Sequence, residues 1–396
     1  MDMADSTGPW GSLKGVRPGK IVQRWMDQGK GPAQIEDELT QVYGMSRDKA
    51  RLLLEVARRQ RPWLLNREQA DRLVSIYIGI PFCPSRCLYC SFPGYPLPAR
   101  GSLVEDFVSA LQREIETVGE GLGRRGMTVQ TIYMGGGTPT SLNPEQLDRV
   151  LGGIVRHLRG PRTFEFTVEA GRPETLTGEC LAVLRRAGVG RLTINPQTLN
   201  DHTLELIGRR HTAADTFAAF RRAREAGFTC INMDIIIGLP GETRADLDRT
   251  LAGVAELNPE NLTVHTLALK RASRLKAEQQ LWKLPDDGAA AESLAAASGF
   301  ARGAGYLPYY LYRQRDILGG LENVGYTRPG FEGVYNIQMI EERQTVIGLG
   351  AGAGSKWLRP GGWWLVNSYN PKDPINYVSR IDELTRRQVD KLSGLG

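Results

Sequence analysis

The chain has 396 residues, 41% of them hydrophobic and 24% charged, a composition typical of a globular protein with two or three domains. Its 50 basic and 44 acidic residues give a net charge of +6, and the basic residues are dispersed, so we expect an acidic small-molecule partner and no nucleic acid. With no run of about 18 apolar residues and no signal peptide at its start, the sequence predicts a cytoplasmic protein without a membrane span.

Two regions precede the first predicted strand. Residues 1–20 are rich in glycine, proline and serine without a hydrophobic pattern, which predicts a flexible leader. Residues 21–66 show three short stretches of helical periodicity, the third capped by Ser46. Three short helices occur in DNA-binding domains, but no basic recognition helix stands out here, so a small docking or lid domain is the expectation.

From residue 70 to 300 a strand, loop and helix pattern repeats six times, which predicts a parallel sheet covered by helices, either open or curled into a barrel. The predicted strands are Leu73–Ile80, Thr128–Met134, Thr163–Glu169, Arg191–Pro196, Thr229–Ile237 and Asn261–Leu267. The predicted helices are Leu103–Thr117, Pro144–His157, Leu176–Ala187, Ala214–Ala226 and Arg244–Leu257. Glycine or polar residues follow all six strands, so we expect one site at the carboxyl ends of the strands.

Three cysteines follow the first strand, spaced by three residues and then two: Cys83, Cys87 and Cys90. Three thiolates can bind three irons of a [4Fe–4S] cluster and leave the fourth without a protein ligand. A zinc site would need a distant histidine, since all four histidines lie more than sixty positions downstream, and three inert buried thiols are the other alternative. The odd, clustered set argues against disulfides. Cys180 and Cys230 have apolar neighbours and are expected to be buried.

These motifs resemble the radical S-adenosylmethionine (radical SAM) superfamily, and within it the coproporphyrinogen dehydrogenase branch of HemN, HemW and HemZ. The likeness rests on Tyr77–Cys83 and the cysteine spacing, and on Leu262–Ser273 and Tyr312–Tyr326, which are similar to the HemZ group. The resemblance implies an α/β fold, a partial parallel (β/α)6 barrel at 70–300 with the small helical domain before it. A C-terminal α+β extension at 301–396, rich in tyrosine and tryptophan, would shape the substrate pocket.

The resemblance also implies two cofactors, a [4Fe–4S] cluster on the three cysteines and S-adenosyl-L-methionine. Glycine has no Cβ, so a backbone of glycines allows the methionyl group to approach closely, and a carboxylate and a guanidinium suit its ammonium and carboxylate groups. By resemblance the cofactor contacts are Tyr77, Tyr89, Gly135, Gly136, Gly137, Thr138, Glu169, Gln197, Arg209, Asp234 and Ala268. Taken singly, the glycines could form a tight turn, Arg209 could end a helix in solvent and Asp234 could cap a helix.

The implied reaction is reductive cleavage of S-adenosylmethionine to a 5′-deoxyadenosyl radical, followed by oxidative decarboxylation of coproporphyrinogen III propionates to the vinyl groups of protoporphyrinogen IX in anaerobic haem synthesis. A reducing partner such as flavodoxin or ferredoxin is then required. The acidic tetrapyrrole would favour a basic rim, unless these cations are solvated loop residues. The candidates for the rim are Arg209, Arg210, Lys270, Arg271 and Arg274.

Two departures keep other functions open. Gly79 replaces a histidine of the family opening, and Ser91-Phe92 follow Cys90 where the decarboxylase branch has Gly-Cys and HemW has Asp-Phe. A HemW-like haem-binding chaperone or insertase, or a radical SAM methyltransferase or cyclase on another substrate, are the alternatives. The HemZ-like stretches extend beyond the barrel and favour the decarboxylase.

Overall fold

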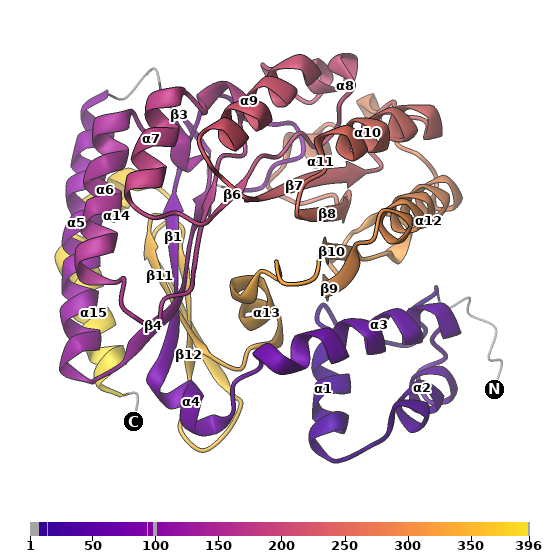
Figure 1. Ribbon diagram of the computed structural model, residues 1–396, viewed down its shortest axis with the longest axis horizontal. Helices are drawn as coiled ribbons and strands as arrows, with labels where there is room; N and C mark the ends of the chain where they lie inside the picture. The colour runs from indigo at the N-terminus through magenta and orange to yellow at the C-terminus, as the bar shows by residue number, and fades with distance from the viewer. Residues whose placement is uncertain (1–7, 14, 93, 98–100, 395–396) are drawn as a thin grey trace.

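The computed structural model describes residues 8–13, 15–92, 94–97 and 101–394, and within them eleven strands form one twisted sheet (Figure 1). Its centre consists of six strands whose order in the sheet follows their order in the chain, and every neighbouring pair is parallel. These strands are β1 (Leu73–Ile80), β4 (Thr128–Gly136), β5 (Glu165–Glu169), β6 (Arg191–Thr193), β7 (Cys230–Ile237) and β8 (Asn261–Thr266). The predicted α/β fold with six parallel strands is confirmed.

Helices cover the outer face of these strands, because each connection between parallel neighbours must cross over the sheet. They are α5 (Gly101–Arg124), α6 (Pro144–His157), α7 (Gly178–Arg186), α9 (Ala213–Glu225), α10 (Arg244–Leu257) and α12 (Asp287–Gly303). The short helices α8 (Asp201–Leu206) and α11 (Arg274–Ala277) instead lie beside Leu88, in the loop that follows β1. Helix α6 illustrates how the sequence determines where a helix begins. The Asn143 side chain accepts the Gln146 backbone N–H, and the Gln146 side chain accepts the Asn143 backbone N–H. Its residues Leu147, Leu151 and Ile154 are buried in the main core.

The residues after 300 extend this same sheet at both of its ends. Strands β9 (Leu307–Tyr312) and β10 (Asn323–Thr327) add antiparallel beyond β8. At the opposite end β11 (Thr345–Gly350) pairs parallel with β1, and β12 (Gly354–Leu358) and β13 (Leu365–Tyr369) follow antiparallel. Helices α14 (Pro374–Ser379) and α15 (Ile381–Ser393) pack against α5. The C-terminal extension therefore has helices and strands, as expected, but shares its sheet with the barrel.

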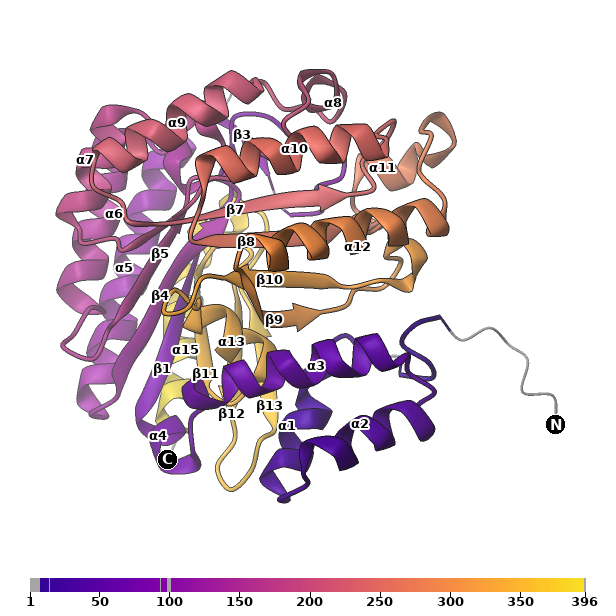
Figure 2. The same ribbon diagram turned by 45° about the vertical axis from the view of Figure 1, so that its right-hand side comes forward.

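One helix, α13 (Val334–Glu341), lies on the inner, concave side of the sheet, between β4 and β9 (Figure 2). The Glu165 carboxylate at the start of β5 accepts the backbone N–H groups at the first turn of α13. Tyr335 then stacks on Tyr133 of β4, with 4.6 Å between ring centroids. Helix α13 thus closes the half-barrel near the start of β5. The carboxyl ends of the strands, on the other side, are left uncovered by this helix.

The N-terminal helices are α1 (Gly19–Asp27), α2 (Pro32–Gln41), α3 (Arg47–Gln60) and α4 (Arg67–Arg72), and α3 packs against β9. The Ser46 side chain accepts the Lys49 backbone N–H, which confirms the predicted cap of α3. In the described part of the predicted leader, Trp10, Leu13 and Pro18 are buried, whereas Gly8, Ser12, Gly15 and Val16 are exposed. Trp10 is 1% exposed and donates from Nε1 to Glu322 at 2.9 Å, whereas residues 1–7 lie outside the described residues.

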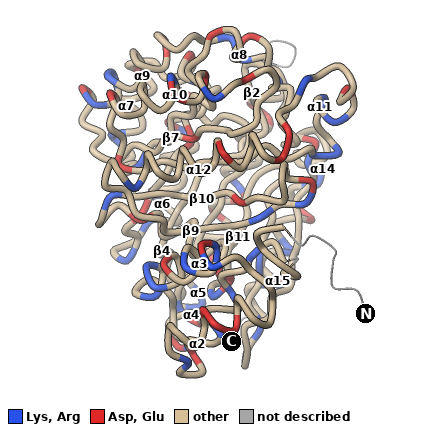
Figure 3. The backbone as a smooth tube through the Cα atoms, turned by 90° about the vertical axis from the view of Figure 1, so that its right-hand side faces the viewer, with Lys and Arg blue, Asp and Glu red and all other residues tan. Residues whose placement is uncertain are grey.

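Along the backbone drawn in Figure 3, Lys and Arg are interspersed with Asp and Glu. Among the described residues, no helix combines the length and the apolar character needed to cross a membrane.

Candidate functional site

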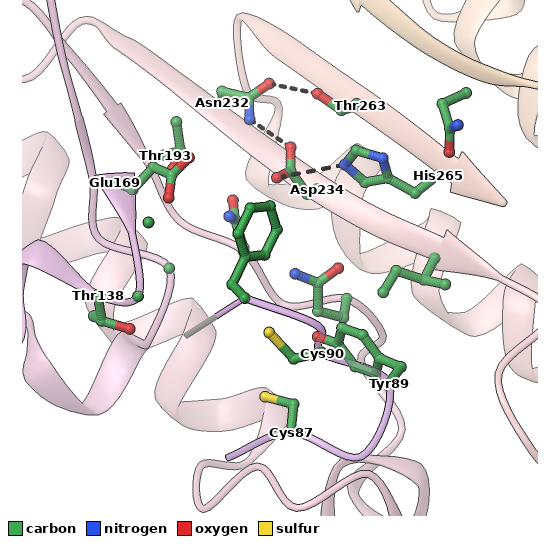
Figure 4. A pocket seen from close by; sticks show the side chains of 18 of the residues that line it. Cys87, Tyr89, Cys90, Thr138, Glu169, Thr193, Asn232, Asp234, Thr263 and His265 are labelled. Atoms are coloured by element: carbon green, nitrogen blue, oxygen red, sulfur yellow. Dashed lines mark hydrogen bonds and ion pairs between the residues drawn. The ribbon is translucent and has the colours of Figure 1, made fainter. Parts of the chain in front are cut away.

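A cavity of about 400 Å³ lies at the carboxyl ends of the six parallel strands (Figure 4). Most of the predicted site residues line it, namely Cys83, Cys87, Tyr89, Cys90, Gly136, Gly137, Thr138, Glu169, Gln197, Arg209, Asp234 and Ala268. Tyr77 and Gly135 are not among the lining residues. The Tyr77 ring lies behind the lining, 6.3 Å from the ring of Tyr133. The strand ends therefore converge on one site, as the pattern of polar and glycine residues predicts.

The cysteine loop is fixed on two sides by backbone hydrogen bonds. Leu88 donates to the carbonyl of Ile207 and accepts from the N–H of Leu275, both at 2.9 Å. Burial raises the pKa of the Cys83 thiol, and it raises that of Cys90 to about 11. Thiols that are hard to ionise in the free protein become stable thiolates only when a cation takes the place of their protons.

The donor set fits an iron–sulfur cluster better than a single metal ion. No three His, Cys, Asp or Glu side chains of the described part of the chain are placed to hold one ion, which argues against the zinc alternative. A cubane does not need its three cysteine sulfurs to converge on one atom, because each binds a different iron. A side chain at Gly137 would crowd one of these thiols, since a Cβ there would lie only 3.0 Å from the Cys83 sulfur.

The glycines at the end of β4 and directly after it allow the backbone to pass close to the cysteine loop and to Glu169. Gly137 donates its N–H to the Ile80 carbonyl at 2.7 Å, and Gly136 has φ +104°, a conformation that favours glycine. A Cβ on Gly135 would lie 2.7 Å from the carboxyl carbon of Glu169. The tight turn that these glycines could form on their own is therefore present, and it also lines the cavity.

Glu169 ends β5 and points into the cavity. Tyr133 donates its hydroxyl to Glu169 at 2.7 Å. Burial raises the pKa of Glu169 to about 7, and the repulsion from Asp234 adds to this effect, whereas the hydrogen bond from Tyr133 opposes it. Binding of a cationic group beside this buried carboxyl would stabilise its ionised form. This is the property expected of a site for an ammonium group.

Arg209 is buried and does not end a helix in solvent. Its Nη2 donates to the carbonyls of Gly171 and Asn195, which follow two of the strands, and its Nη1 donates to the Tyr89 hydroxyl at 3.2 Å. One guanidinium thus joins the cysteine loop to the ends of β5 and β6. Its Nε has no hydrogen-bond partner and is buried, so one donor is left for a ligand.

Asp234 lies on β7 and faces the cavity, so it is not a helix cap. Asn232 donates to its Oδ1 at 2.7 Å, and Nε2 of His265 lies 3.7 Å from Oδ2. Burial tends to raise the pKa of Asp234, but His265 and Asn232 outweigh it, so the pKa is lowered and the carboxylate is ionised. Nearby, Gln197 has φ +69° and a buried Oε1 without a hydrogen-bond partner, an acceptor available to a ligand.

Several residues of the cavity are absent from the prediction. They are Tyr133, Arg172, Asn232, Thr263 and His265, whereas the lining residues Tyr309, Tyr310 and Tyr312 belong to the tyrosine-rich extension expected to shape the substrate pocket. The strand alternation contains the signal for some of them, because Asn232 stands two residues before Asp234 and must face the same side. No such signal exists for Arg172, which reaches the site from a loop. Of the five candidates for a basic rim, Arg209 and Lys270 line the cavity, whereas Arg210, Arg271 and Arg274 are exposed.

Comparisons with known proteins agree with this geometry. Residues 77–252 match the radical SAM superfamily model. HemZ of Bacillus subtilis, an oxygen-independent coproporphyrinogen-III oxidase-like protein, is 41% identical over 98% of this chain and 77% of its own length. The heme chaperone HemW of the same organism is 40% identical over 50% of this chain, which spans about half (51%) of HemW. The structure of coproporphyrinogen III oxidase (HemN) from Escherichia coli superposes with a TM-score of 0.64 at 27% identity, covering 79% of this chain and 70% of HemN.

The chain belongs to the radical SAM superfamily, in the branch that contains HemN, HemW and HemZ. The cofactors of this class are a [4Fe–4S] cluster and S-adenosylmethionine, and the predicted family is confirmed.

Proposed function

We propose that this protein is a radical SAM oxidoreductase that converts propionates of coproporphyrinogen III to vinyl groups and so forms protoporphyrinogen IX without oxygen. The observation that carries the proposal is the extent of the similarity to HemZ, which spans 98% of this chain. It therefore includes β9, β10 and α13, whose side chains line the cavity beyond the predicted cofactor residues. Those elements are the part of the site that a substrate would contact.

When bound, the reduced cluster and S-adenosylmethionine supply the abstraction of a hydrogen atom from a substrate carbon. In this proposal Cys83, Cys87 and Cys90 hold the cluster. Glu169 takes the ammonium group of S-adenosylmethionine, and Arg209 takes its carboxylate through the free Nε. The walls of the cavity exclude water from the reacting carbon, which protects a reactive species from side reactions.

The remaining cavity surface suits a polar, acidic tetrapyrrole. Tyr310, Tyr312 and Asn336 present hydroxyl and amide groups there. Lys270 at the mouth provides a cation for a propionate, and partial burial lowers its pKa, so an incoming carboxylate would strengthen its charged form. A flat macrocycle would gain contact area from the tyrosine rings.

A second candidate, a haem-binding chaperone, is favoured by one specific residue. Phe92 is 61% exposed and lines the cavity mouth, at the position where this sequence departs from the decarboxylase pattern and agrees with HemW. An exposed aromatic ring beside a cavity is well placed to stack on a porphyrin. This candidate keeps both cofactors and predicts stable haem binding without a vinyl product.

The test is anaerobic turnover with mass spectrometry. The reconstituted full-length protein is given a reductant (dithionite or reduced flavodoxin), S-adenosylmethionine and coproporphyrinogen III, with Cys90→Ala as the inactive control. Stepwise loss of two carbon dioxide units together with 5′-deoxyadenosine is the expected result. Deoxyadenosine with intact substrate would contradict the decarboxylase. Haem titration would then decide for or against the chaperone, and a methylated product would reveal a methyltransferase.

A further inference from the structure

A buried arginine contacts the sulfur of one of the three predicted cluster ligands. Arg172 lies three residues after Glu169, the last residue of β5, and is 3% exposed. Its Nη1 donates to the Cys87 sulfur at 3.3 Å, and its Nη2 donates to the Ser85 hydroxyl at 2.7 Å. Both acceptors belong to the cysteine loop, so the guanidinium faces the loop from inside the protein.

The guanidinium is held in this orientation from its other side. Its Nε donates to Oε1 of Glu174 at 2.9 Å, and the second oxygen of Glu174 lies 3.0 Å from Nδ1 of the buried His211. Although burial tends to raise the pKa of Glu174, His211 and Arg172 lower it to about 2, so this carboxylate is ionised. A planar guanidinium with partners on three nitrogens has little freedom to turn away from the sulfur.

An arginine can also serve simply to anchor a loop, and Arg86 offers the comparison within this chain. Arg86 is exposed and donates to the backbone carbonyl of Ala272 at 2.9 Å, a contact that positions the chain but does not touch sulfur. Arg172 instead places a permanent positive charge on the Cys87 sulfur, in surroundings with little water. Electrostatic interactions are stronger there than at the surface.

We propose that Arg172 tunes the reduction potential of the cluster through Cys87, as a positioning residue. An electron added to the cluster increases the negative charge on the cysteine sulfurs, and hydrogen bonds to those sulfurs stabilise the reduced form. Arg172 therefore raises the potential, and the adjacent negative charge of Glu174 limits the rise. The inference rests on Cys87 as a cluster ligand, which loss of the cluster in Cys87→Ala tests separately, and it is independent of the substrate.

The experiment is a redox titration of the reconstituted full-length protein followed by electron paramagnetic resonance, with iron and sulfide analysis of each sample. For Arg172→Met we expect about a tenfold lower ratio of reduced to oxidised cluster at a fixed potential, which corresponds to a midpoint ~59 mV more negative. Glu174→Gln should shift the midpoint in the opposite direction. Arg86→Met, which removes the same charge at an exposed position, should shift it far less because water screens that charge.

An unchanged midpoint in Arg172→Met with full iron content would overturn the proposal, and so would an equal shift in Arg86→Met. If Arg172→Met fails to assemble a cluster, Glu174→Gln decides the matter. A more positive midpoint in that variant supports the proposal, whereas no shift or a more negative midpoint contradicts it. A purely structural role of Arg172 would leave the midpoint of a correctly loaded Arg172→Met protein unchanged.

Discussion

The carboxylate of Glu165 on β5 accepts the backbone N–H of Val334, the first residue of α13, at 2.6 Å. Together with the bond from the Tyr335 N–H to the same carboxylate oxygen, this contact joins α13 to the interior of the half-barrel. Through it α13 places Tyr335 against Tyr133, and Tyr133 in turn donates to Glu169 in the cavity. Glu165, which lies 169 positions before Val334 in the chain, thus helps to place α13 beneath Tyr133 and Glu169.

Replacing Glu165 should destabilise the protein strongly. Glu165→Ala leaves two backbone N–H groups of α13 unpaired and removes the carboxylate that lies 3.6 Å from Arg191. Breaking a buried pair of this kind costs about 3–5 kcal/mol of the free energy of unfolding, measured by urea denaturation. The control Glu116→Ala, at an exposed position of α5, should change it by less than about 0.5 kcal/mol. Similar losses in the free energy of unfolding for Glu165→Ala and Glu116→Ala would contradict the role of Glu165.

Binding of S-adenosylmethionine should depend on pH through Glu169. The pKa of this carboxyl is raised to about 7, so the carboxylate is scarce at pH 6 and predominates at pH 8. Because the ionised form attracts the ammonium group, affinity should increase up to about tenfold between pH 6 and pH 8 and then level off. Equilibrium dialysis under anaerobic conditions, with cluster absorbance recorded at each pH, measures this.

Two variants check the assignment to Glu169. Glu169→Gln should bind weakly and without this pH dependence. Tyr133→Phe removes the hydrogen bond that favours the carboxylate, so the rise in affinity should move to higher pH. If the affinity of Glu169→Gln for S-adenosylmethionine depended on pH as in the wild-type protein, a group other than Glu169 would be responsible.

The glycine at the end of β4 should not tolerate a methyl group. In Gly135→Ala the new Cβ would lie 2.7 Å from the carboxyl carbon of Glu169, so that side chain must move out of place. We expect a loss of about 1–3 kcal/mol in the free energy of unfolding together with weaker cofactor binding. Gly152→Ala, in the middle of α6 with open space around it, should instead gain about 0.5–1 kcal/mol. Calorimetry of both variants gives the comparison.

Each of the three loop cysteines should be essential for the cluster. Cys83→Ala, Cys87→Ala and Cys90→Ala should each lose iron and the visible absorption of the cluster, and with them the cleavage of S-adenosylmethionine. Cys180→Ala removes a buried thiol in α7, away from the cavity, and should keep full iron content. A loop variant with full absorbance and activity would contradict the cluster assignment.

Elements whose signal is local could be predicted from the sequence closely. Strand β1 and helices α6 and α10 begin and end where the hydrophobic pattern places them. Their periodicity is complete, and polar or glycine residues mark their ends. The position of the site could be predicted from the strands in turn, since the carboxyl ends of parallel strands must meet at one edge of the sheet.

Features that depend on distant partners could not be predicted in this way. The sequence around residue 350 does not reveal that β11 pairs with β1, because the partner is chosen by three-dimensional packing. Likewise, Trp10 lies in a polar stretch without periodicity, yet it is buried in the main core and donates a hydrogen bond to Glu322, 312 positions away. The contact of Arg172 with Cys87 joins residues 85 positions apart.

The placement of the last strands has a consequence for how this chain can be made and divided. β1 and β8 would be the edges of the six-stranded core, and both are covered only by strands encoded after residue 300. During synthesis those two edges stay open to pairing with other chains until β10 and β11 have emerged from the ribosome. A fragment ending at residue 300 should therefore associate through its bare edges, and exchanging the C-terminal region between relatives would also exchange both borders of the barrel.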